Sequence, residues 1–142
     1  SSDLCTADFT ARGTYIAVPE SVDPKADVTV SFRGTGFQGL VPLSGGGTLS
    51  PVADGKPSAG WFSSTGILLL TWGSSTCRPV VSDLAEEASG ATVTFASDAK
   101  QACTMDFVPR VTVLDVKAPA DPSAYTLTLK GGGLDGEVPV AG

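Results

Sequence analysis

The chain has 142 residues, a formal net charge of −6 at pH 7 and a sequence pI near 4.4. This acidic balance argues against nucleic-acid binding, which needs a basic face, and against attraction to anionic membranes. Histidine is absent, which excludes a Ser-His-Asp triad, a histidine proton shuttle and histidine metal ligands.

Two strands are predicted in the first third of the chain. Residues 14–18 are rich in β-forming side chains and end before a proline, which predicts a strand. Residues 27–33 alternate between apolar and polar side chains, which predicts a half-buried antiparallel strand. The glycines that follow end this strand, and a short further strand is expected from Val41.

The middle of the chain predicts a linker, a central strand and a hairpin. Residues 44–47, Ser-Gly-Gly-Gly, are the best candidate for a flexible linker. Residues 65–72 form the most hydrophobic stretch, which predicts a buried central strand, and no apolar run is long enough to insert into a membrane. Residues 80–85 are expected to pair with residues 91–96. A helical turn over residues 83–88 is the alternative, because most of these residues are good helix formers.

The last forty residues repeat the first forty-five. Cys-Thr-Met-Asp-Phe at 103–107 matches Cys-Thr-Ala-Asp-Phe at 5–9, which lies 98 positions earlier, and after one deleted residue the offset becomes 97. Other identical pairs are Arg12 with Arg110, Thr14 with Thr112, Asp23 with Asp121, Thr29 with Thr126, Gly34 with Gly131, Gly36 with Gly133, Val41 with Val138 and Pro42 with Pro139. Matches this frequent at one register indicate an internal duplication. Residues 110–116 and 124–130 should therefore form strands like those of the first copy.

The duplication predicts a repeat unit of about 98 residues. Residues 44–142 would be a complete unit, and residues 1–43 would be the second half of a preceding one. Alternatively, the two similar segments pair inside a single sandwich, with residues 44–102 between them. The first interpretation leaves strand edges unpaired, so we expect a homodimer or strand exchange through residues 1–43.

Short strands separated by turn residues predict the fold class. Glycine and proline punctuate the chain at many points, and the hydrophobic content of 42% is enough for a sizeable core. We therefore predict an all-β protein with an antiparallel β-sandwich that is immunoglobulin-like in the broad sense.

Three cysteines predict one disulfide and one cysteine left over. Cys77 and Cys103 both lie in the predicted complete unit and flank its hairpin, so we pair them. Such a bridge stabilises a fold by roughly 3 kcal/mol in the chain-entropy model. Cys5, the counterpart of Cys103, would then pair with a cysteine upstream of residue 1, and a Cys5–Cys77 bridge would contradict this. Three reduced structural cysteines are the alternative.

Two sequence boxes around these cysteines resemble a family. Trp-Gly-Ser-Ser-Thr-Cys-x-Pro at 72–79 and Ala-Cys-Thr-x-Asp at 102–106 are similar to boxes in small exported β-domains of high-GC Gram-positive bacteria. The resemblance covers about residues 60–115. It implies a secreted or cell-surface location and a bridge between Cys77 and Cys103, and it implies no particular activity.

The second box also resembles the reactive-site loop of Kazal-type serine protease inhibitors. By that resemblance Cys103 anchors the loop, Met105 is the specificity residue, Thr104 and Asp106 brace it, and Phe107 follows. A loop held in an extended form binds a protease and is cleaved slowly. The six-cysteine Kazal framework is absent, so a shared function would be convergent. The alternative is a structural strand start, with Phe107 in the core and Asp106 capping a turn.

Three aromatic side chains are further candidates for binding. Trp61, Phe62 and Trp72 could form a platform for polysaccharide, although packing in the core is the alternative for such residues. No carboxylate spacing typical of a calcium loop is present, so we expect no metal site and no cofactor.

These observations predict an exported, non-catalytic β-sandwich repeat module. Its expected role at the cell surface is structural, adhesive or partner-binding, with an extracellular protein or a cell-wall polysaccharide as the partner. A serine protease inhibitor that presents residues 103–107 is the alternative, and no enzyme activity is expected.

Overall fold

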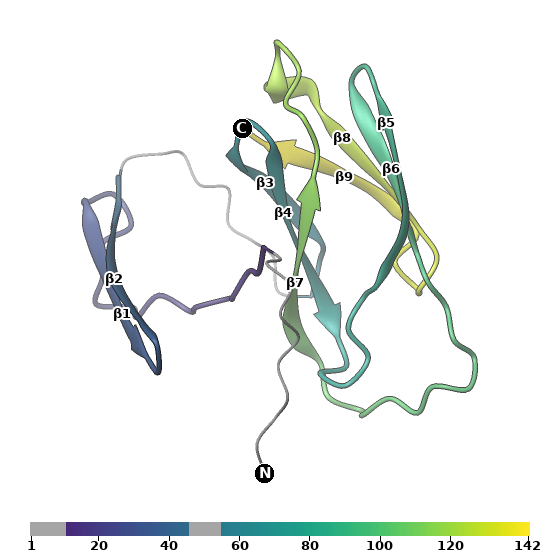
Figure 1. Cartoon of the computed structure of the whole chain (residues 1–142), viewed down its shortest axis with the longest axis horizontal. Helices are drawn as coiled ribbons and strands as arrows, with labels where there is room; N and C mark the ends of the chain where they lie inside the picture. The colour runs from purple at the N-terminus through teal and green to yellow at the C-terminus, as the bar shows by residue number, and fades with distance from the viewer. Residues whose placement is uncertain (1–10, 46–54) are drawn as a thin grey trace. The chain divides into compact units, whose positions relative to one another are not determined.

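The computed structural model describes residues 11–45 and 55–142. These residues fall into two compact units. The sandwich unit contains residues 11–15 and 55–142, and the hairpin unit contains residues 16–45. Strands are the dominant element of both units (Figure 1), which confirms the all-β prediction.

The sandwich unit is a curled mixed sheet with the strand order β5-β6-β8-β9-β3-β4-β7. Its strands are β3 (Ser58–Ser63), β4 (Gly66–Gly73), β5 (Val81–Glu87), β6 (Gly90–Phe95), β7 (Val108–Asp115), β8 (Thr126–Lys130) and β9 (Gly136–Ala141). Neighbours pair antiparallel except β6 with β8 and β3 with β9, which pair parallel. The alternating sequence patterns predict strands but carry no information on these two parallel contacts.

One hydrophobic core joins the two ends of this curled sheet. Side chains from β3, β4 and β7 meet side chains from β6, β8 and β9 in this core. Ile67, Leu69 and Leu127 have no exposed surface. β4 carries two of these residues, so the buried strand predicted at residues 65–72 is confirmed. It lies between β3 and the edge strand β7, so it is second from one edge of the sheet and not at its centre.

The hairpin predicted for the middle of the chain is also confirmed. β5 and β6 pair antiparallel across a turn at residues 88–89, and the helical alternative for residues 83–88 is wrong. The alternation along β6 buries Ala91, Val93 and Phe95, and this burial stabilises the strand more than helix propensity stabilises a single turn.

The hairpin unit consists of two antiparallel strands, β1 (Val28–Gly34) and β2 (Phe37–Leu43). Gly36 closes the turn between them with a φ of 84°, a backbone region that favours glycine. The strand predicted at residues 27–33 is confirmed. The short strand expected from Val41 begins earlier, at Phe37, because the backbone pairing with β1 continues from Leu43 to the turn.

The strand predicted at residues 14–18 is wrong, because the backbone there has no strand pairing. Its repeat counterpart, β7, pairs with β4 over its whole length. Residues 14–18 have no comparable neighbour among the described residues, and an extended segment becomes a strand only when its backbone groups find partners.

Several predictions fall partly or wholly outside the described residues. The linker predicted at 44–47 is described only at its first two residues, and Cys5 is not described. The division into a half unit, 1–43, and a complete unit, 44–142, stays a prediction.

Candidate functional site

A disulfide joins Cys77 to Cys103, with Cα atoms 5.5 Å apart and a sequence separation of 26 residues. The pairing predicted from the sequence is therefore confirmed. The bridge connects the segment after β4 to the segment before β7. We call residues 72–77 and 103–107 the loop pair.

Polar side chains tie the two halves of the loop pair together. The Ser75 backbone N–H donates to both carboxylate oxygens of Asp106, at 3.2 and 3.3 Å, and the Thr104 hydroxyl also donates to this carboxylate. The Thr104 N–H donates to the Thr76 hydroxyl oxygen at 3.1 Å. The hydroxyl oxygens of Ser74 and Thr104 lie 2.7 Å apart. Asp106 and Thr104 therefore hold the backbone on either side of Met105.

These hydrogen bonds also set the charge of Asp106. Donation from Ser75 and from Thr104 lowers the pKa of Asp106 from 3.8 to about 2, because both donors favour the ionised carboxylate. Asp106 therefore stays ionised, and remains an acceptor for the loop, at a lower pH than an ordinary aspartate does.

Arg110, on β7, is hydrogen-bonded to the first half of the loop pair, residues 72–77. Its guanidinium donates to the carbonyl oxygens of Cys77 at 2.7 Å, Trp72 at 3.1 Å and Ser74 at 3.5 Å. Burial lowers the pKa of Arg110 through loss of solvation. A Cβ on Gly73 would lie 2.7 Å from the guanidinium carbon of Arg110. Glycine at position 73 therefore leaves the space that the Arg110 side chain occupies.

The braced loop presents two apolar side chains to solvent. Met105 is fully exposed, and Phe107 is 64% exposed. The Phe107 ring stacks on Trp72 with centroids 6.1 Å apart, and Tyr15 meets the same indole edge-on at 6.5 Å. The interpretation that places Phe107 in the core is therefore wrong.

The three aromatic residues predicted as a platform lie at different places on the β3–β4 hairpin. Trp61 is next to the turn, packs against the core and meets the Tyr125 ring edge-on at 5.2 Å. Phe62 is exposed. Trp72 lies at the far end of β4, within the loop pair. The structure thus joins Trp72 to Phe107, a pairing that the sequence did not indicate, and places Trp61 elsewhere.

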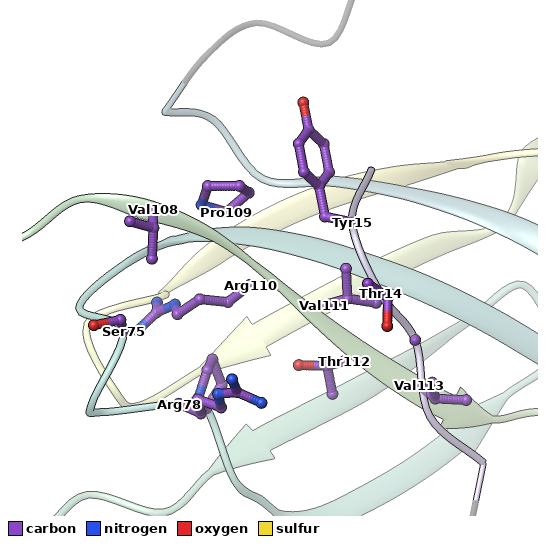
Figure 2. A pocket seen from close by; sticks show the side chains of 12 residues that line it. Thr14, Tyr15, Ser75, Arg78, Val108, Pro109, Arg110, Val111, Thr112 and Val113 are labelled. Carbon is purple, nitrogen blue, oxygen red and sulfur yellow. The ribbon is translucent and has the colours of Figure 1, made fainter. Parts of the chain in front are cut away.

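A groove of about 520 Å³ runs along β7 beside the loop pair (Figure 2). Residues 13–15 form one wall and residues 108–113 the other. The described residues of the lining include Arg78 and Arg110 and no carboxylate. The Arg110 guanidinium already donates to three backbone carbonyl oxygens, so Arg78 is the group that favours an anionic or carbonyl-bearing ligand in the groove. Sequence reasoning missed this groove, because its walls come from segments far apart in the chain.

Two further properties concern the described residues as a set. Within residues 11–45 and 55–142, His, Cys, Asp and Glu side chains form no group of three that could hold a metal ion. In the same ranges, no helix has the length and apolar character that a membrane crossing requires.

Comparison with protein-family models, with curated protein sequences and with solved structures found no match to this chain.

Proposed function

We propose that this chain is a non-catalytic module of an exported protein, with a structural, adhesive or partner-binding role at the cell surface. The observation that carries this proposal is the loop pair, in which a disulfide and a hydrogen-bonded carboxylate hold an extended loop that exposes Met105 and Phe107. A preformed loop loses little conformational entropy when it binds, so its apolar tip is suited to contact another molecule.

The Cys77–Cys103 bridge supports the cellular location in this proposal. Disulfides form and persist in oxidising compartments and are rare in the reducing cytosol. An extracellular protein is the partner that the loop pair fits best, because Met105 and Phe107 offer apolar anchors next to a basic groove. A cell-wall polysaccharide is the second partner class to be tested.

Binding measurements on the whole chain test this proposal. The immobilised chain would be exposed separately to purified cell-surface proteins and to cell-wall polysaccharide from high-GC Gram-positive bacteria. We expect one class to bind and the double variant Met105→Ser, Phe107→Ser to weaken that binding by tenfold or more. Val80→Ser, at an exposed apolar residue outside the loop pair, is the matched control. Equal binding by the wild type and the double variant would contradict the proposal.

A protease inhibitor is the second candidate, and one observation favours it. Met105 is fully exposed, and the side chains of its neighbours Thr104 and Asp106 are hydrogen-bonded to each other. Cys103, the residue before Thr104, is fixed by the disulfide to Cys77. This is the bracing that the resemblance to Kazal-type loops implies. The apolar Met105 would enter the specificity pocket of a subtilisin-like or elastase-like protease.

Inhibition assays decide between the two candidates. An inhibitor would block a subtilisin-like or elastase-like protease at nanomolar concentration, with slow cleavage after Met105. Met105→Arg would shift inhibition toward trypsin-like enzymes, which accept basic side chains, whereas Met105→Leu would retain the original target. Rapid cleavage at this bond, or no inhibition at micromolar concentration, would exclude the inhibitor.

A further inference from the structure

The β1–β2 and β8–β9 hairpins have the same pairing register. When residue numbers are shifted by the repeat offset of 97, each opposed pair of the β8–β9 hairpin falls on an opposed pair of the β1–β2 hairpin. The matching pairs are Thr29–Pro42 with Thr126–Pro139, Val30–Val41 with Leu127–Val138, Ser31–Leu40 with Thr128–Glu137, and Phe32–Gly39 with Leu129–Gly136. The two copies thus share backbone pairing as well as sequence.

Local details of the two copies agree as well. Gly36 and its counterpart Gly133 both adopt a positive φ, 84° and 74°. Ahead of each hairpin, an aspartate accepts a hydrogen bond from the N–H two residues later. For Asp23 the distance is 2.9 Å, and for Asp121 it is 3.1 Å.

The same register places six apolar side chains on one face of each hairpin. The corresponding residues are Val28 with Tyr125, Val30 with Leu127, Phe32 with Leu129, Phe37 with Leu134, Val41 with Val138, and Leu43 with Val140. In β8–β9 five of these side chains are buried and Leu134 packs against the core. In the hairpin unit none of the six is buried, and Phe37 is 61% exposed.

The neighbours of β8–β9 show what such a face packs against. β8 pairs in parallel with β6, and β9 pairs in parallel with β3. Across the core, the apolar face meets side chains from β4 and β7. Among the described residues, β1 and β2 pair only with each other.

We propose that β1–β2 is the closing hairpin of a second sandwich. Its apolar face docks on a strand set like β3–β7 from a neighbouring repeat copy in the same polypeptide. β1 would pair in parallel with the counterpart of β6, and β2 would pair in parallel with the counterpart of β3. This proposal goes beyond the proposed function and does not depend on what the loop pair binds.

Two observations favour this occupant over a second copy of the chain. The sites on β3 and β6 that would receive β1–β2 are already filled by β9 and β8 within the sandwich unit. In the sandwich unit the strands that cover the hairpin also precede it in the sequence. A repeat copy ahead of β1–β2 would reproduce that order.

An extended chain tests the proposal directly. Residues 44–102 would be placed ahead of Cys5, in place of residues 1–4, so that the added Cys77 lies 26 residues before Cys5, the spacing of the observed bridge. We expect peptide mapping to find a disulfide between the added Cys77 and Cys5. We also expect amide exchange in β1–β2 to slow by at least a hundredfold relative to the original chain.

Variants of the extended chain show whether the apolar face makes this contact. Val30→Asp with Phe32→Asp should abolish the new protection, whereas Ser31→Asp, on the opposite face, should retain it. The sandwich unit is the internal reference for correct folding. A free Cys5 thiol, or unchanged exchange in β1–β2, would overturn the proposal. A dimer of the original chain that protects β1–β2 in sedimentation and exchange measurements would assign the face to a second copy instead.

Discussion

The β8–β9 and β1–β2 hairpins have matching sequences and one register, yet only the first is buried. Leu127 has no exposed surface, whereas its counterpart Val30 is only half-buried. The local sequence is therefore sufficient for the hairpin, and the surrounding strands determine whether its apolar face enters a core.

The segments that precede the two hairpins differ more strongly. β7 is a full strand against β4, whereas residues 14–18, its counterpart, form no strand. A hairpin contains its own partner strand, but a single segment depends on a distant one. The hairpin is thus encoded by its local sequence, whereas the single segment becomes a strand only when a neighbouring strand pairs with it.

The largest contrast is expected from removing matched apolar side chains. Leu127→Ala should lower the free energy of unfolding by about 2–5 kcal/mol, because it leaves a cavity in the core. Val30→Ala should change it by less than about 0.5 kcal/mol, because Val30 is only half-buried and belongs to no core cluster of the described residues. Urea unfolding followed by circular dichroism, which reports the strands of both units, measures both. Similar losses would indicate that the hairpin unit is packed as firmly as the sandwich unit.

The disulfide is expected to have the next largest effect. Replacing Cys77 and Cys103 together with serine should destabilise the sandwich unit by roughly 3 kcal/mol, because the unfolded chain regains the freedom that the bridge removes. Cys5→Ser is the control, since it removes a cysteine and leaves this bridge intact. Thermal unfolding with and without reductant provides the measurement. No difference between the double variant and the control would contradict the expectation.

Arg110 and Arg12 occupy matching positions in the two copies and form the third test. Arg110→Lys should cost about 1–3 kcal/mol, because a single ammonium cannot serve the three carbonyl oxygens that the guanidinium reaches. Arg12 is exposed, so Arg12→Lys should cost less than about 0.5 kcal/mol. Chemical denaturation of both variants measures this difference. Equal losses in the free energy of unfolding would contradict a structural role for Arg110.

The smallest effect is expected from the protonation of Asp106. Because its pKa in the folded chain is lowered from 3.8 to about 2, the carboxylate contributes stability that is present above pH 3.8 and is lost as pH falls to about 2. Stability measured from pH 5 to pH 2 should therefore fall more steeply for the wild type than for Asp106→Asn. Parallel curves would show that the loop hydrogen bonds do not favour the ionised form.

Much of this fold follows from sequence patterns. The alternation in residues 27–33, the apolar stretch at residues 65–72 and the duplicated boxes predict the strands that the structure contains. The strand predicted at 14–18 is wrong, because its sequence matches β7 but no strand among the described residues pairs with it as β4 pairs with β7. The parallel contacts of β6 with β8 and β3 with β9 could not be predicted, since they depend on how the sheet curls.

The candidate site was only partly visible in the sequence. The two cysteine boxes indicate that residues near Cys77 and Cys103 meet, and the structure joins them. The hydrogen bonds from Arg110 and the stacking of Phe107 on Trp72 could not be deduced, because both depend on how β7 pairs with β4 next to the loop pair. Trp61, grouped with Trp72 by residue type, lies near the other end of the β3–β4 hairpin.

Native-state hydrogen exchange on the unmodified chain tests the central comparison most directly. We expect the amides of Leu127 and Leu129 to exchange only through global unfolding, and those of Val30 and Phe32 to exchange through local opening, at least a thousandfold faster. Equal protection of the two hairpins would contradict the conclusion that neighbouring strands, rather than the hairpin sequence, determine whether each copy is held in a core.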